Sequence, residues 1–176
     1  AATAVGRAAD FERALQDAPD AVLSLPVVLA ANGLTATLRG FARGSAEERY
    51  ALVGTGAAPE AGKVASVGAL DLLGREGTNR FVRHLVGQQA RVERVTKIED
   101  LLPLLQVQRV DAVLLPARLV AELRAASRLV LAGRDLDQTV GLPAAASTGP
   151  GSGAVLAALG KMPKDLSKLL GVEEWR

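Results

Sequence analysis

The sequence predicts an α/β protein of two small lobes, with mainly parallel sheets, helices on both faces and hinge strands that join the lobes. Apolar runs of strand length alternate with segments of helical spacing along the 176 residues, and parallel neighbours require crossovers of about that length. DAVL occurs at residues 20–23 and again at 111–114, each time between an acidic-capped helix and a helix that a proline begins. Two lobes built on one plan suggest a cleft between them.

Residues 1–54 are expected to form a reduced first lobe. Residues 2–8 predict a short strand, and Asp10 is a suitable N-cap for the helix that follows. DAVLSL then predicts a buried strand, and Pro26 begins the helix PVVLAAN, which Gly33 ends. TATLRGFA and ERYALVGT predict two extended segments before the loop AAPEAG.

Residues 55–138 are expected to form the second lobe. KVASVGAL predicts a strand, and Thr78 or Asn79 caps a helix that carries His84 on its outer face. RVERVT, VDAVLL and RLVLAG predict further strands, with helices in IEDLLPLLQ and ARLVAELRAAS between them. Residues 139–176 then supply a returning hinge strand, TVGLPAAA, and two short helices that pack on the first lobe.

The composition excludes several kinds of site. The 21 basic and 19 acidic side chains leave a net charge of +2, and three Phe, one Tyr and one Trp are too scattered to form a base-stacking platform. We therefore expect no nucleic-acid partner. The chain has no cysteine and a single histidine, so Cys-ligated zinc and multi-histidine metal sites are excluded. No cofactor is expected.

The chain offers two indications of its location. Its apolar runs are broken by Pro, Asp, Arg or Gly well short of the roughly 18 residues that a membrane-spanning helix needs, so membrane insertion is not expected. It opens with AATA, small residues of the kind that follow a removed leader. This favours an exported or periplasmic protein.

From Lys63 onward the sequence resembles the type II periplasmic binding protein superfamily, in particular the solute-binding components of ABC importers for phosphonate, sulfonate and nitrate. The segments that match the order of elements in that family are residues 63–70, 76–85, 92–96 and 109–114, the last reading RVDAVL. Residues 141–143, Gly-Leu-Pro, resemble the returning hinge strand, and residues 155–175 resemble the terminal helices. Residues 10–54 match the end of the first lobe less specifically.

The chain departs from this family in its first lobe, which lacks the opening strand and helix. Such a βα unit takes about 30 residues or more. Either the protein is a reduced member of the family, or something else completes the lobe.

In open α/β sheets ligands bind beyond the carboxyl ends of the strands, where helix N-termini point free N–H groups outward. The residues that follow predicted strands or begin the next helix are therefore the expected ligand-binding set: Ser24, Gly54, Thr55, Gly77, Thr78, Asn79 and Pro116. In GREGTN (74–79), glycine permits close approach of the backbone, and Thr78 and Asn79 add donors suited to an anion.

Each of these residues also has a structural interpretation. Thr78 and Asn79 are ordinary helix caps, Ser24 suits a strand end, and Gly54 and Thr55 suit a turn or hinge. Asp20 and Asp111 precede buried strands and are expected to bond locally to backbone rather than to act as an acid/base pair. His84 is expected to face solvent. No Arg–Asp pair can be assigned from the sequence as a clamp for a zwitterion.

The resemblance implies a non-catalytic receptor that captures a small molecule, an oxyanion or a small organic acid, in the interlobe cleft. Its partner would then be the permease of a membrane ABC transporter. The alternatives on the same fold are an effector-sensing domain of LysR type and a dehydratase-like enzyme. Neither a convincing nucleophile–base pair nor a helix-turn-helix segment is found, and an apolar ligand or a structural role also remains open.

Overall fold

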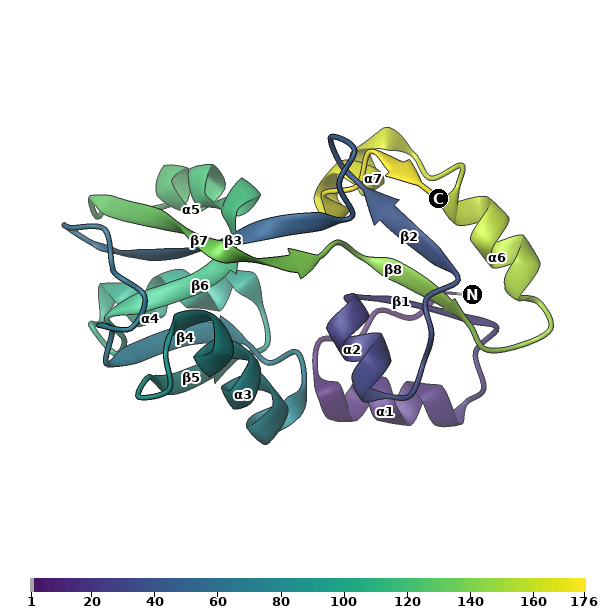
Figure 1. The fold of residues 1–176 in the computed structure, drawn as a ribbon, viewed down its shortest axis with the longest axis horizontal. Coiled ribbons are helices and arrows are strands. Elements are labelled where there is room, and N and C mark those ends of the chain that lie inside the picture. Colours follow the sequence, from purple (N-terminus) through teal and green to yellow (C-terminus); the bar gives the residue numbers. More distant parts are fainter. Residues whose placement is uncertain (1) are drawn as a thin grey trace. The chain divides into compact units, whose positions relative to one another are not determined.

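The computed structural model describes residues 2–176, which divide into two compact units (Figure 1). The larger unit contains Arg49–Thr139 together with the N-terminal residues up to Ala8, and the smaller unit contains Ala9–Glu48 and Val140–Arg176. The chain crosses between the units at residues 48–49 and 139–140, inside two strands, β3 (Glu47–Thr55) and β7 (Leu131–Gly141). β3 and β7 are neighbours in one sheet, so the chain enters the larger unit along one strand and leaves it along the adjacent one.

The larger unit is a five-stranded sheet covered by helices on both faces. Its other elements are β4 (Ser66–Leu70), α3 (Gly74–Val86), β5 (Arg91–Val95), the 3₁₀ turn η1 (Ile98–Asp100), α4 (Leu101–Gln106), β6 (Ala112–Pro116), the 3₁₀ turn η2 (Ala117–Leu119) and α5 (Val120–Ala126). The strand order is β5-β4-β6-β3-β7. β4 runs parallel to β5 and β6, whereas β3 runs antiparallel to β6.

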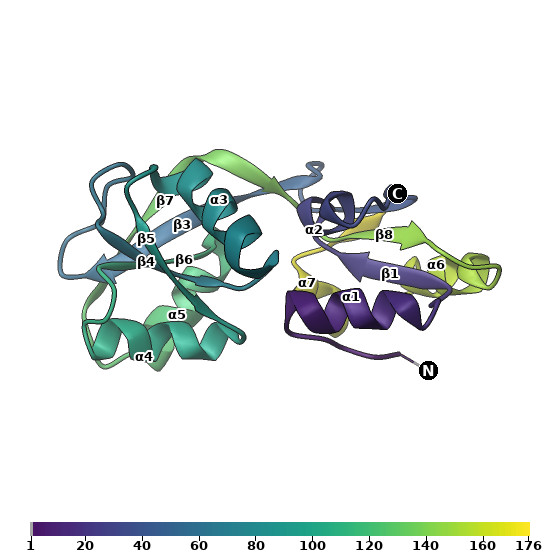
Figure 2. The same cartoon turned by 90° about the horizontal axis from the view of Figure 1, so that it is seen from below.

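Alternation along β3 assigns its side chains to the two faces of this sheet. Tyr50 meets Phe81 of α3 edge-on, with ring centroids 6.2 Å apart. Ala51 and Val53 instead join a core that contains Leu101 of α4 and residues of α5. Figure 2 shows α3 on one side of the sheet and α4 and α5 on the other. Complete burial of a leucine such as Leu101 stabilises the fold by about 1.5–3 kcal/mol.

The smaller unit is a four-stranded sheet, also with helices on both faces. Its elements are α1 (Ala8–Gln16), β1 (Ala21–Ser24), α2 (Pro26–Ala31), β2 (Leu38–Phe41), β8 (Ala144–Ser147), α6 (Ser152–Leu159), α7 (Lys164–Leu170) and β9 (Glu174–Trp175). The strand order is β1-β8-β2-β9. Val22, Ala144 and Ala146 form a small core with Leu29 of α2, against which Phe11 and Leu15 of α1 pack.

The predicted α/β class, the two compact units and the helices on both faces are confirmed. The expected parallel pairing holds for β4 with its two neighbours, but the described pairs of the smaller sheet, β1–β8, β2–β8 and β2–β9, are all antiparallel. Parallel neighbours need a crossover between them. β8 instead enters the smaller sheet directly from β7, and the whole larger unit separates it in sequence from β1 and β2, between which it inserts, so no βαβ crossover sets its direction.

Three local predictions are corrected. Residues 2–7 form no strand, and α1 begins at Ala8. The end of RLVLAG, from Leu131, and the start of TVGLPAAA belong to the single long strand β7, which stops just before Leu142 and Pro143. The helix expected to start at Thr78 or Asn79 begins at Gly74. Both DAVL copies form strands between helices as predicted, β1 before α2 and β6 before η2 and α5.

Candidate functional site

The carboxyl ends of β4, β5 and β6 lie together at one edge of the larger unit's sheet. They end at Leu70, Val95 and Pro116, and because the three strands are parallel, their ends point the same way. α3 begins four residues after β4 ends and places its N-terminus at this edge. This is the edge at which open α/β sheets bind ligands.

Asp71 and Arg94 form an ion pair at this edge. Arg94 Nη1 donates to Asp71 Oδ2 at 2.8 Å, and the two side chains are only 28% and 18% exposed. The backbone N–H of Asp71 donates to the carbonyl of Val95 at 2.8 Å, which joins the end of β4 to the end of β5. The guanidinium is therefore held in a fixed position, largely shielded from solvent.

Thr78 ties the start of α3 to the same pair. Its hydroxyl donates to Asp71 Oδ1 at 3.0 Å and accepts the backbone N–H of Leu73 at 2.9 Å. Thr78 is completely buried within the helix. It is therefore not the N-cap that the sequence suggests, because its hydroxyl reaches back to the strand end from the second turn.

The arrangement suits the binding of an anion. Within the described residues, the structure gives the Arg94 guanidinium one hydrogen bond, and an arginine carries five N–H donors. The N-terminus of α3, a 13-residue helix, adds a partial positive charge. Asp71 partly neutralises the charge of the guanidinium. The other N–H donors of Arg94 stay available for a carboxylate or another oxyanion.

Gly54 and Thr55 lie at the opposite edge of the sheet. In the antiparallel pairing of β3 with β6, Tyr50 is opposite Pro116 and Gly54 is opposite Ala112. Gly54 therefore lies beside the start of β6, where an added Cβ would come within 2.8 Å of Pro59 Cγ and 3.0 Å of the Asp111 carbonyl. The close packing of Pro59 and Asp111 explains why this position holds a glycine.

The remaining predicted residues fall in three places. Pro116 is buried at the carboxyl edge of the parallel strands, as the last residue of β6. Gly77 and Asn79 lie inside α3, and the Oδ1 atom of Asn79 is buried without a hydrogen-bond partner. Ser24 ends β1 in the smaller unit, opposite Ala144. The structure thus brings Pro116, Gly77, Thr78 and Asn79 into one unit at or near one sheet edge.

The two aspartates that open the DAVL segments bond to backbone, but the prediction that these bonds are local is wrong. Asp111 Oδ2 accepts the N–H groups of Ala65 and Ser66 and the hydroxyl of Ser66, at 3.1, 2.8 and 2.9 Å. Asp20 Oδ1 accepts the N–H of Gly151 at 2.7 Å. Their partners are distant in sequence, so each aspartate fixes a remote segment to the start of its strand. His84 is exposed on α3.

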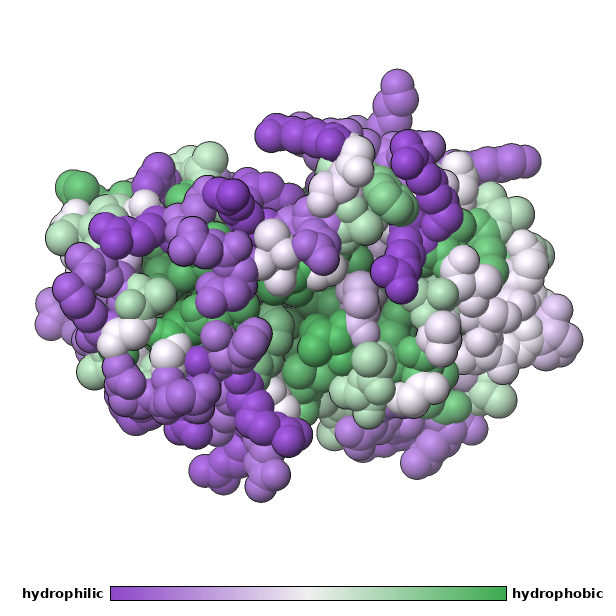
Figure 3. Space-filling model, in the orientation of Figure 1, coloured by the Kyte–Doolittle hydropathy of each residue, from purple (hydrophilic) through white to green (hydrophobic). Residues whose placement is uncertain are grey.

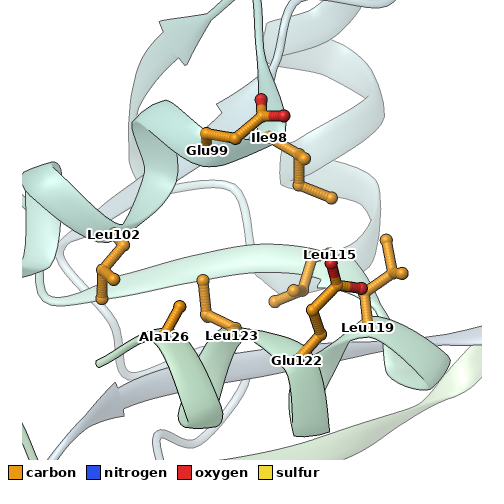
Figure 4. A pocket seen from close by; sticks show the side chains of 8 residues that line it. All are labelled: Ile98, Glu99, Leu102, Leu115, Leu119, Glu122, Leu123 and Ala126. Carbon is orange, nitrogen blue, oxygen red and sulfur yellow. The ribbon is translucent and has the colours of Figure 1, made fainter. Parts of the chain in front are cut away.

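A separate pocket of about 170 Å³ lies in the larger unit, on the face of the sheet that α4 and α5 cover (Figure 4). Its lining residues are Ile98, Glu99, Leu102, Leu115, Leu119, Glu122, Leu123 and Ala126. None of the predicted site residues contributes to it. Its wall is aliphatic apart from the side chains of Glu99 and Glu122.

Sequence reasoning missed Asp71 and Arg94, although each carries a signal. Asp71 directly follows the run KVASVGAL, and Arg94 occupies a polar position of the alternating strand RVERVT. Their pairing depends on the register Ala69–Arg94 and Leu70–Val95, which places the ends of β4 and β5 side by side. The sequence shows both residues, but only the register shows that they meet.

No protein-family model and no curated protein matches the sequence. Among solved structures, holo ArgBP from T. maritima is 15% identical, with a TM-score of 0.61 over 95% of this chain and 76% of that chain. The BvgS periplasmic VFT2 domain of Bordetella pertussis is 14% identical, with a TM-score of 0.59 over 94% of this chain and 72% of that chain.

A third structure, the substrate binding protein of an amino acid ABC transporter, is 13% identical with a TM-score of 0.49, and the match covers 70% of this chain. The present chain spans 55% of the length of that protein. The likeness to ArgBP and to the VFT2 domain shows a shared fold. The fold of this chain is that of periplasmic binding proteins, as the resemblance in its sequence implies.

Residues 2–176 contain neither a metal-ligand cluster nor a membrane-spanning helix. No cluster of His, Asp and Glu side chains in this range could hold a metal ion. No helix in the described part of the chain has the length and apolar character needed to cross a bilayer.

Proposed function

We propose that this chain is a non-catalytic solute-binding protein that captures a small organic anion in the periplasm for an ABC-type importer. The observation that carries the proposal is the Asp71–Arg94 pair, held at the carboxyl edge of a parallel strand group beside the N-terminus of α3. The fold shared with periplasmic binding proteins supports it.

The proposed ligand carries a carboxylate or a similar oxyanion. The free donors of Arg94 would bind its oxygens, and the low exposure of the guanidinium strengthens such bonds relative to water. The hydroxyl of Thr78 is already committed to Asp71 and Leu73, so it holds the guanidinium's counter-charge in place rather than acting as a nucleophile. This chemistry is binding without covalent change.

Closure of the two lobes on the ligand, in the cleft expected from the sequence, is part of the proposal. A ligand shifts such an equilibrium only by as much as it prefers the closed state. The permease would then distinguish the closed, loaded protein from the open one.

A periplasmic sensor module is the second candidate. The likeness to the VFT2 domain of BvgS, over 94% of this chain, favours it. Both candidates require the same anion-binding site at the carboxyl ends of β4 and β5. They differ in the protein or domain that recognises the ligand-bound state. The full reading frame separates them, because a neighbouring signalling domain accompanies a sensor and a leader alone accompanies an importer component.

A thermal-shift screen tests the proposal directly. The panel contains amino acids, dicarboxylates, phosphonates, sulfonates, nitrate and uncharged apolar molecules. We expect at least one anion to stabilise the protein, by about 2.7 kcal/mol at a hundred times its dissociation constant. Arg94→Gln should abolish the shift, and Arg134→Gln, at an exposed position of β7, should retain it.

Two results would contradict the proposal. One is a flat screen on protein whose unfolding is cooperative. The other is an anion-induced shift that Arg94→Gln leaves unchanged, because the binding site would then lie elsewhere.

A further inference from the structure

The pocket on the α4–α5 face of the larger unit's sheet has walls that the core holds in place. Leu115 of β6 and Leu123 of α5 belong to the buried core of this unit, and Ile98, Leu102 and Leu119 pack against the same core. These side chains line the pocket, whose volume is about 170 Å³. Closely packed side chains move little, so the pocket is present before any ligand binds.

One continuous stretch of chain, residues 98–126 of the larger unit, supplies the lining of this pocket. The stretch runs from η1 through α4, β6 and η2 to α5. The aliphatic wall differs from most of the larger unit's surface in Figure 3, which is purple and therefore hydrophilic. An aliphatic pocket of this kind favours the hydrocarbon part of a ligand.

Two glutamates supply the charges of this pocket. Figure 4 shows Glu99 on η1 and Glu122 on α5, on opposite sides of the pocket, and the Glu122 side chain reaches into the space between the helical segments. Within residues 2–176 neither carboxylate has an ion pair or a side-chain hydrogen bond. Arg124 of α5 lies instead against β7, with Nη2 3.5 Å from the position of a Cβ added at Gly133. The pocket therefore combines two negative charges with an aliphatic floor.

We infer that this pocket binds a small aliphatic primary amine, with its ammonium group at the carboxylates of Glu122 and Glu99 and its hydrocarbon chain on the leucine floor. A primary ammonium has three N–H donors, and carboxylates accept such bonds strongly. Within the described residues no aromatic side chain lines the pocket, so it lacks the aromatic faces that bind quaternary ammonium groups. The combination of charge and wall thus specifies the class of ligand.

The volume of the pocket sets the length of the hydrocarbon chain. An apolar cavity of about 150 Å³ is large enough to bind benzene. The volume of 170 Å³ therefore suits a chain of about six carbons, the number in benzene. Each methylene that enters the pocket should increase the affinity by up to about fourfold. The gain should stop once the chain is longer than the pocket.

This pocket is independent of the proposed anion site. Asp71, Thr78 and Arg94 do not line it, and its charge is opposite to that of the Arg94 guanidinium. A negative result for the amine therefore leaves the anion proposal unaffected, and the reverse also holds.

The test titrates the intact chain with the linear alkylamines from propylamine to octylamine. NMR follows the methyl groups of Ile98, Leu119 and Leu123, which should shift together and saturate, and the affinity should rise up to hexylamine and then level off. Hexanol has the same hydrocarbon chain without the charge and should bind about tenfold more weakly, because it forms no ion pair with either carboxylate. Hexanoate, which both glutamates repel, should leave these methyl signals unmoved.

One pair of matched variants tests the charge. Glu122→Gln keeps the shape of the side chain and should weaken hexylamine binding about fivefold, the effect of losing a favourable exposed ion pair. Glu76→Gln, at an exposed glutamate of α3 outside the pocket, should leave hexylamine binding unchanged.

A second pair tests the volume. Ala126→Leu fills part of the pocket while both carboxylates stay in place, and it should reduce hexylamine binding at least tenfold. Ala125→Leu, at the exposed neighbouring residue of α5 outside the pocket, should leave binding unchanged. Far-UV circular dichroism checks that all four variants are folded.

Three outcomes would overturn the inference. Equal affinities for hexanol and hexylamine would show that the glutamates take no part in binding. An affinity that does not change with chain length would show that the amine pairs with surface charge and leaves the pocket empty. Full binding of hexylamine by Ala126→Leu would place the amine elsewhere on the protein.

Discussion

Asp71 and Arg94 lie 23 residues apart in sequence, yet their carboxylate and guanidinium form an ion pair of 2.8 Å across the ends of β4 and β5. The parallel register of the two strands brings them together. Thr78 completes the cluster from α3. One acidic residue thus joins two strands and a helix at the proposed binding edge.

This pair should contribute to folding as well as to binding. Asp71→Asn, Arg94→Gln and the double variant form a double-mutant cycle in urea unfolding. Because both side chains are mostly buried, we expect a coupling free energy of about 1 kcal/mol, toward the upper end of the range for exposed pairs. Additive effects of the two substitutions would show that the ion pair does not stabilise the fold.

Gly77 should resist replacement although it lies inside a helix. An added Cβ would be 2.6 Å from Leu73 Cβ, an atom that cannot move without the backbone. Gly77→Ala is therefore expected to lower the free energy of unfolding by about 1–3 kcal/mol, because overpacking outweighs the gain in helix propensity.

Gly153 of α6 provides the matched control, since nothing lies within 4 Å of its added Cβ. There the same change should stabilise the protein by about 0.5–1 kcal/mol. Thermal and urea unfolding of both variants measure the contrast. Equal effects at the two positions would contradict the close approach of Leu73 to α3.

Asp111 should matter more for stability than an ordinary surface aspartate. Its carboxylate accepts three hydrogen bonds from Ala65 and Ser66, and replacement by asparagine weakens charge-assisted bonds. We expect Asp111→Asn to lower the free energy of unfolding by about 1–3 kcal/mol. Asp137→Asn, at an exposed position of β7, should change it by less than about 0.5 kcal/mol. Similar losses in both variants would contradict this role.

Glu174 should titrate below the usual range for a glutamate. A hydrogen bond from Arg176 at 2.7 Å lowers the pKa of Glu174. The pair's contribution is therefore complete above the ordinary glutamate pKa and is lost as the pH falls through the lowered value. An NMR titration of the Glu174 carboxyl carbon should give a higher midpoint in Arg176→Gln than in the natural chain. Equal midpoints would show that the pair does not form in solution.

Much of the fold can be predicted from the order of apolar runs and breakers. Both DAVL strands, the helix started by Pro26 and the α/β class follow from local patterns, because each depends on residues that are neighbours in sequence. The antiparallel placement of β8 does not. It depends on the return of β7 from the other unit, which no local pattern encodes.

The candidate site is likewise predicted only in part. Strand ends and helix-capping residues predict Pro116 and the segment containing Thr78, and both lie at the carboxyl edge of the parallel strands. Gly54 and Thr55 lie at the opposite edge because β3 runs antiparallel to β6. Thr78 and Asn79 suggest the start of a helix, yet α3 already begins at Gly74. The Thr78 hydroxyl bonds to Asp71 and Leu73, and this tertiary contact outweighs the local signal.

The most direct test of the account is an NMR titration that follows the side-chain Nε–H of Arg94 and the backbone amides of Leu73 and Gly74 while a stabilising anion from the screen is added. The account predicts that these signals shift together and saturate with the affinity measured by calorimetry. Saturation with all three signals unmoved, while residues elsewhere respond, would contradict an anion-binding site at this edge.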